Sequence, residues 1–395
     1  MQLRILGQDP VAAPLPVRGP AGGAWLAYGF RPFFLAGASA AVVLMGLWLM
    51  ILGGLQCPHP RLDPVHWHAH EMLFGFGGAV VAGFLLTAVP NWTGLPTPKG
   101  GRLAALLAVW LAGRLGSWWG GAGVVYDLAF LPVLGLSLAG PLWQAGQLRN
   151  LIFLPVLGLL WSADALFWLG SSRSLALSLA LYGLLLLIAL IGGRVIPFFT
   201  EKALGNHKPG RVAALEVVSL VGLFLCALVE SWPGSFLTLK VAALLLTALA
   251  HSLRMLGWGD RRALALPLLG VLYLGYSFLP IGLVLRALAW LGWGSLSAAT
   301  HALTAGCVAV MCLGMMARVA LGHTGRELRP APLTVVAFGL VGAAAGCRSL
   351  LPFIWPRFYS QALWCGGTLW CLAFALFLLA YWPVLTRPRV DGKPG

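Results

Sequence analysis

Apolar stretches long enough to cross a lipid bilayer recur along this chain from residue 32 to residue 385. A spanning helix needs about 20 mostly apolar residues. Charged residues make up only 9% of the 395 positions, whereas a soluble domain carries about 25%. The predicted fold is therefore all-α, a polytopic membrane protein with about 12 transmembrane helices. We place these helices at residues 32–54, 65–90, 102–120, 122–142, 149–170, 174–199, 212–232, 235–256, 263–290, 295–321, 331–351 and 359–385.

The two ends of the chain differ in composition from this apolar middle. Residues 1–24 contain four prolines and lack the apolar core of a cleavable signal peptide. We predict that residues 1–24 form a disordered cytoplasmic tail and that residues 25–385 form a single transmembrane domain. Residues 386–395 are predicted to form a second cytoplasmic tail.

The basic residues predict how the helices are oriented. Of the 26 Lys and Arg residues, 19 fall on one side of the predicted helices and 7 on the other. Since Lys and Arg collect on the cytoplasmic side, both termini are expected there, in a bacterial inner (cytoplasmic) membrane. The net charge of +15 thus reflects orientation. No basic run with interleaved aromatics occurs, so the expected partner is the lipid bilayer and not a nucleic acid.

Histidines cluster at the outer end of the second predicted helix, where His66, His68 and His70 precede Glu71. Ionisable side chains inside a bilayer are costly and usually have a functional reason. On a helix His66 and His70 share one face and His68 points nearly opposite, unless the first turn is irregular. Imidazole binds copper, iron and zinc, so all three are candidate metal ligands. Glu71 is a candidate to orient a ligand or relay a proton; the alternative is an interfacial His/Trp belt.

His301, early in the tenth predicted helix, repeats the spacing of the second. His70 lies 23 residues before Thr93, and His301 lies 23 residues before Thr324. The glycines match under the same shift: Gly75 and Gly83 correspond to Gly306 and Gly314. Because both helices are predicted to run inward, His70 and His301 should lie at a similar depth, near the outer surface. Two level histidines on facing helices suit axial ligation of one haem iron.

A second group of ionisable residues falls near the cytoplasmic ends of the helices. His323 lies 22 residues beyond His301, or about 33 Å along a helix, so these two histidines cannot share a metal. A candidate inner site contains His251, His323, Arg31, Arg194, Arg318 and Arg326. The alternative is a network of helix caps and lipid head-group contacts.

The tenth helix also carries soft donor atoms, and other helices carry carboxylates. Cys307, Met311 and Met315 follow each other at intervals of four residues. Thiolate and thioether sulfur favour Cu(I), but the same residues also fill ordinary cores. Four acidic residues besides Glu71 fall inside predicted helices: Asp127, Asp164, Glu216 and Glu230.

Six segments of the chain resemble the signatures of the NnrS family. They are Phe30-Arg-Pro-Phe-Phe34, Trp67-His-Ala-His-Glu-Met-Leu-Phe-Gly75, Gly83-Phe-Leu-Leu-Thr-Ala-Val-Pro-Asn-Trp-Thr-Gly94, Gly192-Gly-Arg-Val-Ile-Pro-Phe-Phe-Thr200, His301-Ala-Leu-Thr-Ala-Gly306 and Arg318-Val-Ala-Leu-Gly-His-Thr-Gly-Arg326. The resemblance extends from about residue 25 to residue 385.

The resemblance implies a bacterial twelve-helix membrane protein that contains haem b and copper and is linked to nitric oxide and nitrosative stress. It implies ligand candidacy for His68, His70, His301 and His323. It also marks three motif arginines, Arg31, Arg194 and Arg318. His66 lies outside the family motif. The helix count and a haem shared by two helices are similar to the haem–copper oxidase core, although this chain has no adjacent His-His pair.

Three kinds of function are compatible with these patterns. The first is a redox metalloprotein that senses, sequesters or converts nitric oxide. Quinol is its expected electron donor, because no Cys-x-x-Cys-His motif occurs. The second is a secondary transporter of a small solute or ion, since twelve helices with both ends inside is also a transporter layout. The third is a membrane scaffold without a metal.

Overall fold

A computed structural model describes residues 23–57, 62–119, 121–170, 172–206, 208–232, 234 and 236–393. Most of the tail predicted for residues 1–24 lies outside this part of the chain. Every regular element in the described part is helical. In chain order the elements are η1 (Ala24–Leu26), α1 (Phe30–Leu52), α2 (Pro64–His70), η2 (Glu71–Gly77), α3 (Gly78–Thr93), α4 (Gly101–Trp119), η3 (Gly121–Gly123), α5 (Val124–Gln144), α6 (Leu148–Leu151), α7 (Phe153–Leu169), α8 (Arg173–Leu204), α9 (Ala213–Ser231), α10 (Leu237–Trp258), α11 (Arg261–Leu264), α12 (Pro267–Trp290), α13 (Leu296–His301), η4 (Ala302–Val308), α14 (Ala309–His323), α15 (Pro332–Arg348), α16 (Leu350–Ile354), η5 (Pro356–Phe358) and α17 (Tyr359–Thr386).

The helices confirm an all-α, multi-pass membrane protein. Within the described residues, 11 helical runs are long and apolar enough to span a membrane. The remaining predicted span corresponds to α4, which has 19 residues but carries Arg102 and Arg114 and is less apolar than the others. Large apolar side chains such as Val217, Val221 and Leu225 are exposed on the bundle, as expected of a surface that faces lipid.

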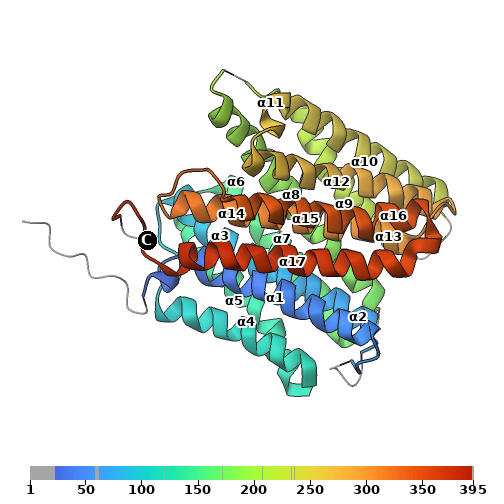
Figure 1. Cartoon of the computed structure of the whole chain (residues 1–395), viewed down its shortest axis with the longest axis horizontal. Helices are drawn as coiled ribbons and strands as arrows, with labels where there is room; N and C mark the ends of the chain where they lie inside the picture. Colours follow the sequence, from blue (N-terminus) through green and yellow to red (C-terminus); the bar gives the residue numbers. More distant parts are fainter. Residues whose placement is uncertain are drawn as a thin grey trace, which may run out of the picture.

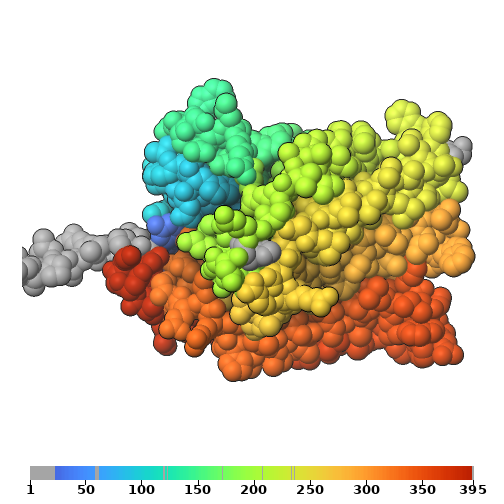
Figure 2. Space-filling model, turned by 90° about the horizontal axis from the view of Figure 1, so that it is seen from above, coloured from blue at the N-terminus to red at the C-terminus, as the bar shows by residue number. Residues whose placement is uncertain are grey.

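The bundle has a buried centre and two flanks. The runs Pro64–Thr93 and Leu296–His323 are the most buried, each 78% within its most apolar window. α17 packs against α15 and α1 along one flank, and α4 packs against α5. Figure 2 shows α17 in red along one edge and the teal α4–α5 region along the opposite edge. The central helices are thus shielded from lipid by helices on both sides (Figure 1).

The two central runs are broken in the same way. Each begins as a short α-helix, α2 or α13, passes through seven residues of π-helix, and continues as α3 or α14. The π-helical segments η2 and η4 begin directly after His70 and His301, so the two breaks have the same offset as the histidines. π-helical turns are rare and occur mostly at functional sites. The repeat expected from spacing is therefore present in the backbone.

Both ends of the described chain lie at one end of the bundle, where α1 begins and α17 ends (Figure 1). The Arg31 guanidinium donates to the carbonyl oxygens of Leu385 (2.9 Å) and Arg387 (2.7 Å). Farther along, Trp370 Nε1 donates to the carbonyl oxygen of Ala41 at 2.9 Å. α2 and α13 begin at the opposite end of the bundle, so the candidate site lies far from the termini.

Candidate functional site

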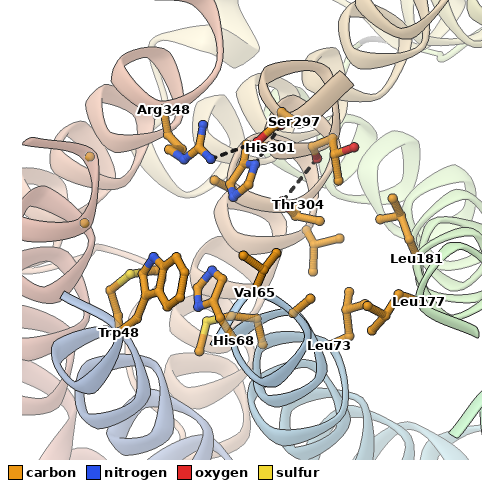
Figure 3. Close-up of a pocket in the computed structure, with 18 of the residues that line it drawn as sticks. Trp48, Val65, His68, Leu73, Leu177, Leu181, Ser297, His301, Thr304 and Arg348 are labelled. Carbon is orange, nitrogen blue, oxygen red and sulfur yellow. Dashed lines mark hydrogen bonds between the residues drawn. The ribbon is translucent and has the colours of Figure 1, made fainter. Parts of the chain in front are cut away.

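A cavity of about 400 Å³ lies between the helices at the end of the bundle opposite the termini. α2 and α13 supply His68 and His301 to its wall, and α1, α8, α12, α15 and α17 also contribute to it. The other polar or aromatic lining residues are Trp48, His66, Phe76, Ser174, Ser178, Arg286, Ser297, Thr300, Thr304, Arg348 and Trp370. Figure 3 shows His68 and His301 entering the cavity from opposite sides. The cavity therefore joins the two histidine motifs.

His68 is fixed by an aromatic neighbour and not by hydrogen bonds. Its ring stacks on Trp48 of α1, with centroids 4.4 Å apart and planes inclined by 16°. Its Nδ1 is buried and has no hydrogen-bond partner among the described residues. A buried polar nitrogen without a partner is costly. His68 thus offers a nitrogen for a ligand that the protein chain does not supply.

His301 is oriented by its own helix. Its Nδ1 lies 2.7 Å from the carbonyl oxygen of Ser297, one turn earlier. A carbonyl oxygen only accepts, so Nδ1 carries the proton, and in the neutral ring Nε2 keeps its lone pair. Metal-bound histidines commonly donate their other ring N–H to a carbonyl oxygen in this way. His301 is therefore prepared as an Nε2 ligand.

Two arginines add positive charge to the cavity wall. Arg286 of α12 is neutralised by Glu230 of α9, with Nε 2.9 Å from a carboxylate oxygen. Arg348 at the end of α15 donates to the Ser297 hydroxyl at 3.1 Å and to the Tyr359 hydroxyl at 3.4 Å. No described carboxylate lies within ion-pair distance of Arg348. The cavity thus carries one uncompensated cation, which suits a ligand with an acidic group.

The structure does not bring His70 and His301 together, in contrast to the expected axial pair. Successive helix residues are about 100° apart, so residues two apart point to nearly opposite sides. His68 faces the cavity, whereas His70 faces α5 and α7, where Nε2 lies 2.9 Å from Asp164 and 3.3 Å from Asp127. The two helices with matched spacing both line the cavity, but His68 is the residue of α2 that faces His301.

The remaining residues of the histidine motif take different positions. His66 lies at the rim of the cavity, and its ring is held by the carboxylate of Asp63, the N-cap of α2. Glu71 lies on the His70 side and not in the cavity. Its Oε1 accepts from Arg114 at 3.0 Å and from Ser117 at 2.8 Å.

The residues of the expected inner site have separate partners. Arg31 contacts the end of α17, as described above. Arg194 donates to the side-chain oxygen of Asn150 at 2.7 Å, and the Arg318 guanidinium lies over the Phe199 ring. His251 contacts the Tyr276 hydroxyl at 2.7 Å.

His323 contacts none of these residues in the described part of the chain. Its ring packs near Phe30, and its carbonyl oxygen accepts from Arg389 at 2.7 Å. Such contacts at a helix end agree better with helix capping than with a metal site. Nothing in this region joins His251 and His323 in one cavity.

Soft donors on α14 line a second, smaller cavity. Met311, Cys312 and Met315 contact a space of about 60 Å³ between α3, α8 and α14. Cys307 is buried but does not line it. The wall is apolar throughout, with Phe34 and Leu184 among its members.

Several residues that line the cavity carry no motif by which the sequence could predict their role. Trp48 carries no local motif and belongs to a uniformly apolar helix. Arg286 and Arg348 were visible only as isolated arginines near helix ends. An arginine inside an apolar stretch is itself a signal, because such a charge is costly unless it faces the interior of the bundle.

The comparison with protein families agrees with the motifs. A family model described as NnrS protein matches residues 24–389. No curated protein matches the chain.

Proposed function

The chain belongs to the NnrS family, and from this premise we propose that it is a haem-binding membrane protein of the nitric oxide response, with His68 and His301 as the haem ligands. One observation carries the proposal. Buried His68 and half-buried His301 face one cavity from helices broken at matching positions. Among the described residues, Nδ1 of His68 has no hydrogen-bond partner, and Nδ1 of His301 bonds the Ser297 carbonyl, which leaves Nε2 for a ligand. Family membership supports the link to nitric oxide.

The residues around the cavity fit haem b. A porphyrin needs apolar walls, nitrogen ligands and a partner for its carboxylates. Met72, Leu177 and Trp370 are among the apolar wall residues. The orphaned Nδ1 of His68 is the clearest sign that a ligand from outside the chain completes this site. When bound, haem iron supplies reversible binding of nitric oxide and one-electron redox chemistry.

The chain's own residues have distinct roles in this proposal. Trp48 sets the plane of the His68 ring by stacking, and the Ser297 carbonyl sets the tautomer of His301. Arg348 offers a charged donor to an anionic group. Because the ligands come from α2 and α13, the bound group would tie the two central helical runs together.

Copper is the second metal that we propose, following the family resemblance. Met311, Cys312 and Met315 share a small apolar cavity, and sulfur ligands favour Cu(I). His251 and His323 remain candidate ligands, but their separate partners favour the sulfur group. We also propose membrane quinol as the electron donor, because the chain lacks an attachment motif for a c-type haem.

Optical spectroscopy of purified full-length protein tests the haem ligands. We expect a low-spin haem spectrum in the wild type and its loss or conversion to high-spin in His68→Ala and in His301→Ala. His251→Ala serves as the matched control, since His251 is a buried histidine on α10 that does not line the cavity. Unchanged spectra in both His68→Ala and His301→Ala would exclude this ligand pair.

A second measurement separates catalysis from binding. A nitric oxide electrode records consumption by the wild type with a reduced quinol. Steady consumption that disappears in His301→Ala supports a redox enzyme. A single stoichiometric uptake supports binding or sequestration. A colourless, metal-free preparation that still protects cells from nitric oxide would overturn the metalloprotein proposal.

A further inference from the structure

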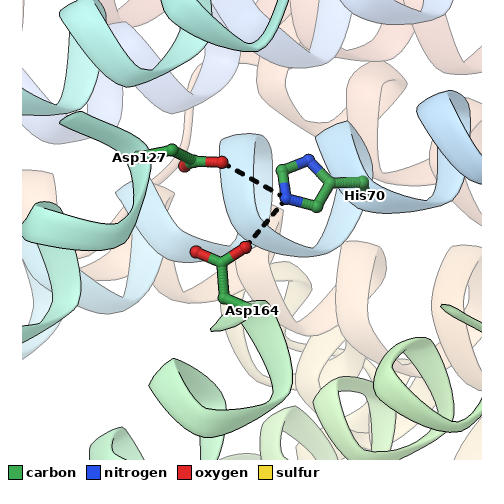
Figure 4. A group of neighbouring side chains, drawn as sticks. All are labelled: His70, Asp127 and Asp164. Atoms are coloured by element: carbon green, nitrogen blue, oxygen red, sulfur yellow. Dashed lines mark hydrogen bonds and ion pairs between the residues drawn. The ribbon is translucent and has the colours of Figure 1, made fainter. Parts of the chain in front are cut away.

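A buried polar cluster lies behind the haem cavity, on the opposite side of the same helix. His70 points into it from α2, Asp127 from α5 and Asp164 from α7, and all three side chains are buried. Figure 4 shows both carboxylates directed at one imidazole nitrogen. The ligand atoms of the three residues lie within 4.8 Å of one another.

Both nitrogens of His70 face carboxylates. Nδ1 lies 3.4 Å from Glu71 Oε1, while Nε2 lies 2.9 Å from Asp164 Oδ1 and 3.3 Å from Asp127 Oδ2. A neutral imidazole has one N–H and one lone pair. If Glu71 accepts from Nδ1, the lone pair of Nε2 faces two anionic oxygens. A positive charge near Nε2, supplied by a proton or by a metal ion, would remove this repulsion.

The charges of the cluster indicate which species fits. Three carboxylates, Glu71, Asp127 and Asp164, meet here, and Arg114 is the one described cation within ion-pair distance of them. With a neutral His70, two negative charges remain uncompensated. Glu71 Oε2 is buried and has no hydrogen-bond partner among the described residues. Buried charges are normally paired or bind metals, and one divalent cation would balance this cluster.

The distances also match those of ligands around one ion. Nitrogen and oxygen ligands lie about 2.0–2.2 Å from a metal such as zinc, so neighbouring ligand atoms are about 2.8–3.6 Å apart, from octahedral to tetrahedral geometry. The two distances from Nε2 fall within this range. Glu71 behind Nδ1 completes a carboxylate–histidine arrangement that is common at metal sites, and Ser117 holds Glu71 in place.

We propose that His70, Asp127 and Asp164 bind a divalent first-row cation such as Zn²⁺ or Mn²⁺, at a site separate from the haem cavity. The one nitrogen and two oxygen ligands favour such an ion over Cu(I), which prefers sulfur. The ion would join α2 to α5 and α7 and so hold the helix that presents His68. The alternative is two protons shared by the same groups, which would leave no metal site.

Metal titration of the purified full-length protein tests the site. The protein is stripped with a chelator and titrated with Mn²⁺ alone, and free Mn²⁺ is followed by electron paramagnetic resonance. We expect one saturable site per chain that Zn²⁺ displaces. Asp164→Asn should weaken binding at least about tenfold. Glu216→Gln is the matched control, because Glu216 pairs with Arg254 and not with His70.

Measuring Mn²⁺ binding and haem content together distinguishes a failure of this metal site from a failure of the haem proposal. Haem absorbance is recorded in the same samples, so Asp164→Asn should lose Mn²⁺ while retaining haem, and His301→Ala should do the reverse. If Asp164→Asn does not fold, the wild-type titration alone decides. Absence of saturable binding in the wild type, or equal affinity in Asp164→Asn, would overturn the proposal and favour the protonated cluster.

Discussion

His68 and His301 face one cavity from two helices that change to π-helical geometry within three residues of each histidine. A π-helical turn contains an additional residue and shifts the register of the side chains that follow it. In both helices the histidine lies before the shift, and the long apolar helix lies after it. The histidines are thereby aimed at the cavity independently of the packing of α3 and α14.

Arg348 should raise the reduction potential of a haem in this cavity. Its hydrogen-bond partners are neutral hydroxyls, so its charge disfavours the oxidised iron. Removing one nearby charge is worth about 1.4 kcal/mol in a partly buried site, or roughly 60 mV for a one-electron couple. We expect a downward shift of this size in Arg348→Gln, measured by potentiometric titration. The exposed Arg357→Gln is the control, and equal potentials in both variants would contradict the assignment.

Close packing between α12 and α14 makes Gly275 intolerant of a larger side chain. A Cβ at Gly275 would lie 2.8 Å from the backbone nitrogen of Met311, whereas one at Gly339 would meet nothing within 4 Å. Backbone cannot move away without separating the helices. We expect Gly275→Ala to destabilise the protein by about 1–3 kcal/mol and Gly339→Ala to be neutral. Thermal unfolding in detergent, followed by circular dichroism, compares them; equal midpoints would refute this account.

Removing one partner of the Glu230–Arg286 pair should strongly lower the free energy of unfolding. Glu230 accepts from Arg286 Nε at 2.9 Å and from Trp290 Nε1 at 2.6 Å, and it also accepts from Tyr182. Glu230→Gln leaves a buried guanidinium unpaired, and we expect a loss of about 3–5 kcal/mol. Replacing Arg286 by Met in the same protein should recover part of that loss. The free energy of unfolding of the single and double variants is the measurement, and full additivity would contradict the coupling.

Orientation in the membrane is a further prediction. The distribution of basic residues predicts that both termini are cytoplasmic, and the described chain ends lie at one end of the bundle. A green fluorescent reporter fused after residue 395 should therefore fluoresce. Alkaline phosphatase inserted near residue 56, between α1 and α2, should be active because that loop faces outward. The reverse pattern would place the cavity between His68 and His301 on the cytoplasmic side.

Sequence patterns predicted the helices and the two histidine-bearing segments, because both depend on local chemistry. Spans of about 20 apolar residues follow from the thickness of a bilayer, and the boundary predicted between residues 120 and 122 lies between the end of α4 at Trp119 and the start of α5 at Val124. The sequence does not indicate which of His68 and His70 faces the cavity. That choice depends on how far the helix is rotated against its neighbours, which tertiary packing determines.

The His70 cluster shows a second limit. Asp127 and Asp164 were each recognisable as carboxylates in apolar helices. Their convergence on His70 depends on how α5 and α7 lie relative to the end of α2, and no spacing in the chain encodes that contact. Arg114, which neutralises part of the cluster, lies in α4, the helix with the weakest apolar signal.

The contact between α1 and α17 has a consequence for biogenesis. The carbonyl oxygens that accept from Arg31 lie 354 and 356 residues later in the chain. Trp370, which donates to the Ala41 carbonyl, is also synthesised long after its partner. During synthesis, the first helix therefore enters the bilayer long before its permanent neighbour emerges from the ribosome. A chain that ends before α17 would lack the carbonyl oxygens of Leu385 and Arg387 that accept from Arg31, so α1 reaches its final packing only when synthesis is complete.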